Sequence, residues 1–349
     1  MPNETSGWAS LTERNSAIRF IDVNLRGAGQ VIFQNNPWTG LFFLLAIVWG
    51  AIAGGQIVIG ISAIVALVIA TVTAMLLDVD ETSLRQGMFG FNGVLVGAAV
   101  PTFLVPSPEM WVVVIIGAAV STVVMLAVSN VMKTWGAPAL TFPFVLTTWF
   151  LVLMPYAFSD LQIASMGPPK LPHSLTETGF EHLAAAQLIA AWLKGPAQVF
   201  LINNAVSGVL VVIGLLISSL WAGGLALAGS AVGVILALYF GASVKDIEQG
   251  LFGFSAVLTA VGLGSAFFKP AWRVMLFALL GTIFTVMVQG ALDGALAPLG
   301  IPTFTAPFVF ATWLFLLPKE KLQPHPHAPI KNGVVGESRG SRQHSGSAS

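Results

Sequence analysis

The chain contains no cysteine among its 349 residues, and only 9% of them are charged. The lack of cysteine excludes disulfides, zinc sites built on thiolates and cysteine nucleophiles. Lys plus Arg equals Asp plus Glu at 15 each, so no excess of positive charge points to nucleic acid as a partner. A soluble domain has about 25% charged residues. The chain is therefore too poor in charge for an ordinary soluble protein.

Sequence motifs of several enzyme and pump classes are also missing. The chain has no GxxxxGK[ST] loop for nucleotide phosphates and no HExxH helix for zinc. Histidine is absent from residues 1 to 172 and again from 183 to 324. We therefore expect no enzyme, no ATP-driven pump, no metal and no cofactor, and we expect no histidine inside the apolar body.

What the chain has in abundance is hydrophobic sequence, at 56% of residues. A run of about 18 apolar residues predicts a helix able to cross a hydrocarbon core about 30 Å thick. The two longest charge-free runs, 37–77 and 205–244, have room for two helices each. Other charge-free runs cover 110–132, 135–159, 250–268, 274–292 and 294–318. The composition therefore predicts an all-α integral membrane protein in a lipid bilayer.

Three stretches of sequence occur twice, in the same order. GAGQVIFQNNPWTG (27–40) matches GPAQVFLINNAVSG (195–208), QGMFGFNGVL (86–95) matches QGLFGFSAVL (249–258), and LTFPFVLTTW (140–149) matches FTAPFVFATW (304–313). The separations are 168, 163 and 164 residues. Collinear matches at nearly constant separation are typical of an internal duplication.

The duplication predicts the organisation of the chain. We expect a polar N-terminal segment at 1–16, a first repeat at 17–158, a connecting loop at 159–184, a second repeat at 185–318 and a disordered tail at 319–349. Each repeat contains six apolar segments. The first of each, 17–36 and 186–204, carries charged or polar residues, and we interpret it as a half-membrane helix buried in protein.

The ten other segments would then be transmembrane helices, and an odd number of crossings per repeat makes the two homologous repeats inverted around a central pore. Segments 88–105 and 250–268 are an alternative choice for the half-length elements. Arg14, Arg19, Lys319 and Lys321 near the ends, against Lys170 in the connecting loop, favour cytoplasmic termini. We expect Asp293, at the end of an apolar segment, to reach the membrane interface.

The doubled blocks resemble the signature blocks of the urea transporter family, over residues 17 to 318. The resemblance implies a channel-like facilitator of urea in the inner membrane, assembled as a homotrimer with one pore in each protomer. It implies pore-lining roles for matched positions in the two repeats, with the glutamines at the ends of a selectivity filter and the threonines at its centre. These positions are Gln30, Val31, Phe33, Phe91, Leu95 and Thr141, and Gln198, Val199, Leu201, Phe254, Leu258 and Thr305. Some family members carry a carboxylate where Gln198 stands and an aromatic residue where Leu201 stands.

The residue types suit this role. Urea is flat, neutral and strongly polar, so a dry pore must replace its hydrogen bonds to water. Flat walls of Phe33, Phe91 and Phe254 would set the width of a slot, with the leucines opposite and with threonine and glutamine oxygens along it. Each threonine stands one residue before an xPF sequence, where proline favours the start of a helix.

Other interpretations of the same residues stay open. A phenylalanine in an apolar helix commonly packs in a core, a glutamine bonds a neighbouring helix, and a threonine bonds its own backbone. An ion-coupled transporter could also have inverted repeats, but it would be expected to hold acidic or histidine residues inside the membrane. A channel for another small neutral solute, such as a short amide or ammonia, is the remaining alternative.

Overall fold

The computed structural model describes residues 7–166, 169–171 and 183–318. Residues 1–6, 167–168, 172–182 and 319–349 lie outside these ranges, and so do the predictions made for them, including the disordered tail. Within them the secondary structure consists of helices and one isolated bridge between Leu104 and Ile163, without a strand. The predicted all-α class is therefore confirmed for the described residues.

The helices follow the same order in the two halves, and all twelve predicted apolar segments are helical over most of their length. In the first half the helices are α1 Gly7–Arg14, α2 Ser16–Gln30, α3 Pro37–Ala53, α4 Ile57–Leu76, α5 Glu81–Arg85, α6 Phe91–Phe103, α7 Pro108–Thr134 and α8 Phe142–Leu153. In the second half they are α9 Ala185–Gln198, α10 Ala205–Ser218, α11 Leu220–Tyr239, α12 Val244–Glu248, α13 Phe254–Val261, α14 Trp272–Leu296 and α15 Ala306–Leu316.

The helices differ in how much of a membrane they could cross. Four in the described ranges are long and apolar enough to cross one: Ile57–Leu76, Pro108–Thr134, Leu220–Tyr239 and Trp272–Leu299, which is α14 with the 3₁₀ turn after it. Six shorter apolar helices have 10–17 residues. At 1.5 Å per residue, α8 with its 12 residues covers about 18 Å. The chain is thus a multi-pass helical membrane protein whose helices are of unequal length.

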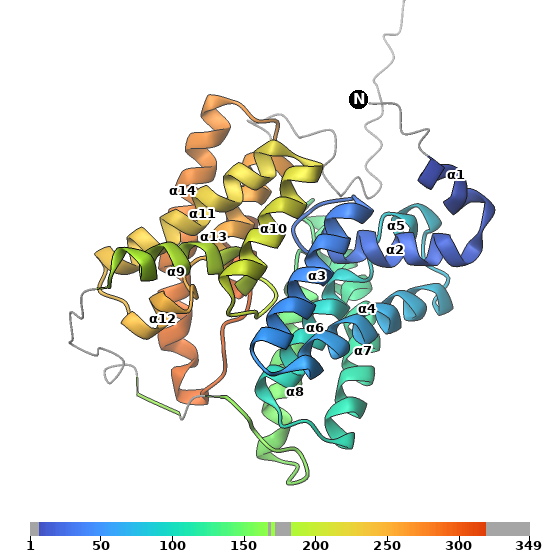
Figure 1. Cartoon of the computed structure of the whole chain (residues 1–349), viewed down its shortest axis with the longest axis horizontal. Coiled ribbons are helices and arrows are strands. Elements are labelled where there is room, and N and C mark those ends of the chain that lie inside the picture. The colour runs from blue at the N-terminus through green and yellow to red at the C-terminus, as the bar shows by residue number, and fades with distance from the viewer. Residues whose placement is uncertain (1–6, 167–168, 172–182, 319–349) are drawn as a thin grey trace, which may run out of the picture.

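The two halves lie side by side, with the second half at the left of Figure 1 and the first at the right. Helices α3 and α10 pack against each other between them. The Thr39 hydroxyl donates to the carbonyl of Gly214, and the Ser207 hydroxyl donates to the carbonyl of Ala46, both at 2.7 Å. Thr39 and Ser207 are 168 residues apart, as are Ala46 and Gly214. The contact is reciprocal, as at a two-fold axis.

Glycines in the first doubled block permit close helix crossing inside each half. A Cβ on Gly40 would lie 1.7 Å from the carbonyl oxygen of Leu25, and a Cβ on Gly208 would lie 1.7 Å from that of Leu193. Helices α2 and α3 therefore meet backbone to backbone, and so do α9 and α10. The doubled glycines are needed for this packing.

A π-helix at Gly262–Ala266 explains why the separation between matched blocks changes. It continues α13, whereas the matching α6 stays α-helical to Phe103. A π-helical turn accommodates one extra residue, which changes the separation from 163 before this point to 164 after it. Phe267 is therefore the counterpart of Phe103.

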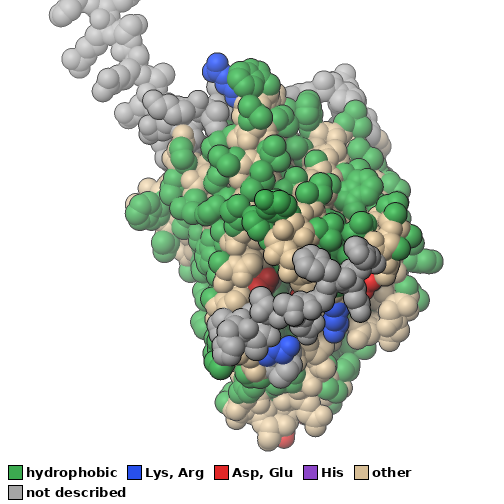
Figure 2. Space-filling model, turned by 90° about the vertical axis from the view of Figure 1, so that its left-hand side faces the viewer, with side chains coloured by type: hydrophobic (Ala, Val, Ile, Leu, Met, Phe, Trp, Pro, Cys, Tyr) green, Lys and Arg blue, Asp and Glu red, His purple; other side chains and the backbone are tan. Residues whose placement is uncertain are grey.

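The surface suits a lipid environment. Figure 2 shows the side that lies at the left in Figure 1, where hydrophobic side chains cover most of the upper part and charged ones gather lower down. Helices α11 and α14 expose large apolar residues, among them Leu220, Trp221, Ile235, Leu276 and Leu280. Soluble monomers rarely expose so much contiguous apolar surface.

Candidate functional site

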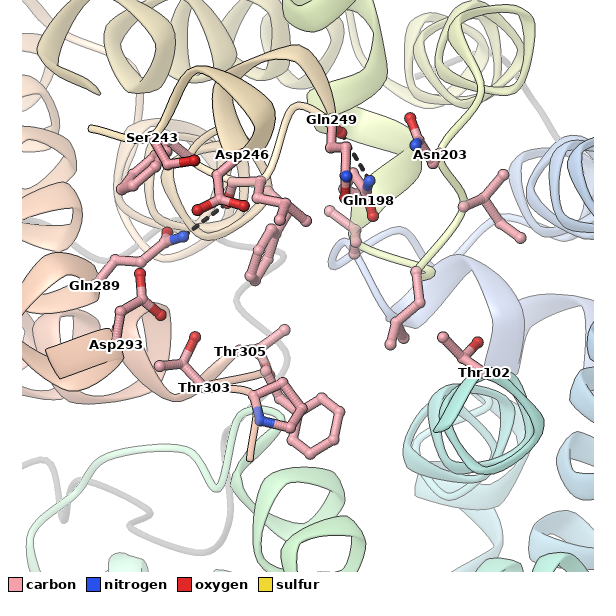
Figure 3. Close-up of a pocket in the computed structure, with 18 of the residues that line it drawn as sticks. Thr102, Gln198, Asn203, Ser243, Asp246, Gln249, Gln289, Asp293, Thr303 and Thr305 are labelled. Carbon is pink, nitrogen blue, oxygen red and sulfur yellow. Dashed lines mark hydrogen bonds between the residues drawn. The ribbon is translucent and has the colours of Figure 1, made fainter. Parts of the chain in front are cut away.

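A cavity of about 1290 Å³ is lined by residues of both halves. We call it the vestibule. Helix α14 supplies a large part of its wall, and the first half contributes Thr102 (Figure 3) as well as Phe103 and Phe144. Five predicted site residues line it, all from the second half: Gln198, Val199, Leu201, Phe254 and Thr305.

Two threonine hydroxyls meet where the halves join. Oγ1 of Thr141 and Oγ1 of Thr305 lie 2.6 Å apart, and either can donate to the other. Both side chains are buried, and each residue precedes the first turn of a short helix, α8 or α15. The N-termini of these two helices thus approach each other. Their partial positive charge and the hydroxyl oxygens make this point suitable for a neutral polar solute and unfavourable for a cation.

The loops that carry these threonines have an unusual backbone. Leu140 has a φ of 53° and Phe304 a φ of 48°, in the left-handed region that bulky residues rarely adopt. Phe33 and Leu201, after α2 and α9, share this conformation at 61° and 59°. Such strain persists only where surrounding contacts hold it, and it is common at functional sites. Phe33 and Leu201 are predicted pore positions, and Leu140 and Phe304 directly precede the predicted Thr141 and Thr305.

Two tryptophans hold the threonine loops across the junction. The indole N–H of Trp149 in α8 donates to the carbonyl of Pro302 at 2.9 Å, and that of Trp313 in α15 donates to the carbonyl of Pro138 at 2.7 Å. Each half therefore positions the loop of the other. The tryptophans end the doubled blocks TTW and ATW, but nothing in those blocks indicates which group either indole would bond.

The two glutamines make equivalent bonds. The side-chain amide nitrogen of Gln30 donates to the carbonyl of Gln86 at 2.9 Å, and that of Gln198 donates to the carbonyl of Gln249 at 2.7 Å. These bonds fix each amide, so its oxygen points elsewhere as an acceptor. Within the described residues neither oxygen receives a hydrogen bond. Each glutamine can therefore accept a hydrogen bond from an N–H of a solute.

The other predicted residues do not line the vestibule, and most of them are buried in the core. Phe33 packs against the second half, Phe91 is 5% exposed, and Leu95 and Leu258 have no exposed surface. Val31 and Val199 are 1% exposed, although Val199 reaches the vestibule wall. Five predicted residues therefore line the vestibule and Thr141 contacts one of them, Thr305, whereas Val31, Phe91, Leu95 and Leu258 are part of the buried core.

A second, smaller cavity of about 430 Å³ is lined by Gln86, whose carbonyl accepts from Gln30. Several of the residues that line it are charged, and most of these form ion pairs with one another. Arg26 bonds Asp22 at 2.7 Å, and Arg85 bonds Glu81 at 2.7 Å. Asp80 caps the N-terminus of α5, and hydrogen bonds from the backbone and side chain of Ser83 hold the pKa of Asp80 below its usual value.

Acidic residues in the vestibule were not predicted. Asp246 of α12 and Asp293 of α14 line it, together with Gln289 and Thr303, and Figure 3 shows them around the space opposite Gln198. Asp293 was expected to reach the membrane interface; its side chain is exposed and lines the vestibule. Residue spacing alone did not place it on the vestibule wall, because α14 is apolar around most of its circumference.

Comparisons with known proteins give a consistent result. The family model described as urea transporter matches residues 21–320. A protein named Urea transporter 1 from Ovis aries is 28% identical over 321 residues, which cover 90% of this chain and 80% of that protein. Urea transporter 1 from Rattus norvegicus is 29% identical over 324 residues, with the same coverage.

Proposed function

The chain belongs to the urea transporter family, and from this premise we propose that it carries urea down its concentration gradient through a narrow pore within each protomer. The observation that carries the proposal is the pair of hydroxyls of Thr141 and Thr305, which meet at the junction of the matched halves. In this proposal Gln30 and Gln198 mark the two ends of the filter, because each donates its amide N–H to a backbone carbonyl and keeps its amide oxygen as an acceptor.

The chemistry of urea explains why these groups are needed. Urea has four N–H donors and one carbonyl acceptor, and an amide that loses its hydrogen bonds in an apolar medium costs about 4–8 kcal/mol. Acceptors at the glutamines and threonines replace bonds to water for the N–H groups. The threonine hydroxyls can also donate to the urea carbonyl. A neutral planar solute is thus compensated at several points along the path.

The apolar residues supply selectivity in this proposal. Phe91 and Phe254 lie at matched positions at the start of α6 and α13, and Leu95 and Leu258 follow one turn later. Rigid aromatic faces admit a flat molecule and exclude a bulkier one of similar polarity. The meeting helix N-termini at Thr141 and Thr305 oppose cations such as ammonium.

The topology belongs to the same proposal. The ten apolar helices of the long and short classes are the transmembrane helices, and α2 and α9 are the half-membrane elements. Reciprocal bonds between matched residues support two homologous repeats related by a two-fold axis. In Figure 1, α5 beside the smaller cavity and α12 beside the vestibule lie toward opposite ends, which supports an inverted arrangement. The homotrimer, the inner membrane and the cytoplasmic termini rest on the family resemblance and the charge distribution.

One observation favours a second candidate. Asp246 and Asp293 place carboxylates in the vestibule, and carboxylates inside a transporter can couple transport to protons or sodium. Neither residue has an acidic counterpart in the first half, where Ser83 and Ser129 occupy the matched positions. Carboxylates that could couple transport to an ion therefore occur on the vestibule side of the path only, and ion coupling is the weaker alternative.

A flux assay in proteoliposomes separates the candidates. Urea, thiourea, glycerol and ammonium are offered in parallel, first without any ion gradient and then with a proton or sodium gradient. We expect fast urea flux without a gradient, slower thiourea flux and little glycerol or ammonium flux. Urea flux that requires a gradient would establish ion coupling and refute the facilitated channel.

A further inference from the structure

The two halves differ in where they carry a phenylalanine at two pairs of matched positions near the predicted pore. Phe33 in the first half is matched by Leu201 in the second, so the second half has no aromatic ring at that position. The reverse exchange occurs in the threonine loops, where Leu140 is matched by Phe304. Each half therefore has one phenylalanine and one leucine at these two positions, in opposite order.

In the first of these arrangements, the ring of Phe33 packs on two rings of the second half. Its centroid lies 5.1 Å from that of Phe267 at an interplanar angle of 69°, and 5.9 Å from that of Phe308 at 59°. Phe33 thus completes a group of three rings, and aromatic pairs at these distances and angles are favourable.

The counterparts of Phe267 and Phe308 are Phe103 and Phe144 in the first half. Their partner is the ring of Phe304, whose centroid lies 5.6 Å from that of Phe103 at 80° and 5.2 Å from that of Phe144 at 63°. The two groups are alike in composition, although the centroid distances of counterpart pairs differ by 0.5 and 0.7 Å. Leu201 and Phe304 both line the vestibule, as do Phe103 and Phe144.

We infer that Phe304 forms the aromatic wall of the solute slot on the vestibule side, in place of the ring that Leu201 lacks, and so determines which solutes pass there. This inference rests on the proposed function and adds a residue that the doubled pattern did not indicate. The ring comes from a different loop, one residue before Thr305. On the vestibule side the selecting ring therefore belongs to the threonine loop. On the other side the equivalent ring, Phe33, belongs to the loop after α2.

Three variants test the inference. Phe304→Leu places at 304 the residue found at its matched position and removes the ring. Leu201→Phe adds a second ring to a slot that Phe304 already fills, in a backbone conformation that Phe33 adopts in the other half. The exchange Leu201→Phe with Phe304→Leu restores one ring. Phe268→Leu is the control, because Phe268 is 1% exposed, lies outside the vestibule wall and is matched by a buried leucine at 104.

The measurements are urea flux and the glycerol-to-urea flux ratio in proteoliposomes, with thermal stability in detergent. We expect Phe304→Leu to raise the ratio about two- to tenfold, the size of effect that one aromatic contact gives. Leu201→Phe should lower urea flux, and the exchange should return the ratio to the wild-type value. The control should leave the ratio unchanged.

The outcomes separate this inference from the proposed function. If wild-type protein carries no urea, the proposed function fails before any variant is compared. If the wild type carries urea but Phe304→Leu keeps its ratio, Phe304 is a packing residue and the inference is wrong. Should Phe304→Leu not fold, Leu201→Phe decides, since unchanged urea flux in that variant would mean that Phe304 does not occupy the slot.

Discussion

The contact between Thr141 and Thr305 gives the sharpest prediction. Replacing either threonine with valine keeps the shape of the side chain and removes its hydroxyl. The two oxygens lie 2.6 Å apart in a buried setting, so a single replacement leaves the other hydroxyl without its partner. An unpaired buried group costs about 1–3 kcal/mol, whereas replacing both partners by apolar groups is nearly neutral. Each single variant should therefore be less stable than the double variant.

Urea flux should follow the opposite order to stability, with the double variant slowest. Each hydroxyl that bonds urea at the highest point of the barrier contributes about 0.5–1.5 kcal/mol, which corresponds to a two- to tenfold change in rate. Thr141→Val and Thr305→Val should each lower urea flux by about that factor. The double variant should lower it by about five- to a hundredfold although it is the most stable of the three.

A second buried threonine pair supplies the control. The hydroxyls of Thr259 and Thr285 lie 2.8 Å apart between α13 and α14. Valine at both positions should change stability in a similar way and leave urea flux at the wild-type value. The assay is rapid-mixing urea efflux from proteoliposomes, with melting temperature measured in detergent on the same preparations.

Two results would refute the reasoning. Unchanged flux in both single variants and in the double would remove the threonines from the pore. Flux that recovers in the double variant together with stability would mean that the two hydroxyls only hold the halves together.

Three further variants test other parts of the structure. Alanine at both Phe91 and Phe254 should raise the glycerol-to-urea flux ratio, at a stability cost of about 3–5 kcal/mol for each buried ring; lower stability with a wild-type ratio would indicate packing alone. Trp149→Phe keeps an aromatic ring and removes the N–H that bonds the threonine loop of the other half. Urea flux should therefore fall several-fold with little loss of melting temperature. Wild-type flux in this variant would show that other contacts hold the loop. Gly208→Ala should prevent folding because its Cβ would lie 1.7 Å from a backbone oxygen, whereas Gly224→Ala, with open space around it, should fold normally; a stable Gly208→Ala protein would contradict the helix crossing.

The sequence alone determined the positions of the long helices and the family. Runs such as Pro37 to Leu77 are recognisable because hydrophobicity and length are local properties of the chain, and a turn at Gly54 and Gly55 separates the two helices in this run. The duplication was also readable, since it needs only a comparison of the chain with itself. The five-residue helices α5 and α12 were missed because such short helices carry no periodic pattern.

The tertiary structure alone decided which residues face one another. Thr141 and Thr305 are 164 residues apart, and nothing in either segment shows that their hydroxyls touch. The same holds for Phe304, whose ring packs on Phe103 and Phe144 of the first half, and for Asp293, which lines the vestibule. Side-chain direction in an apolar helix or a strained loop depends on packing between distant segments, because almost every face of the segment is apolar and the local pattern prefers none of them.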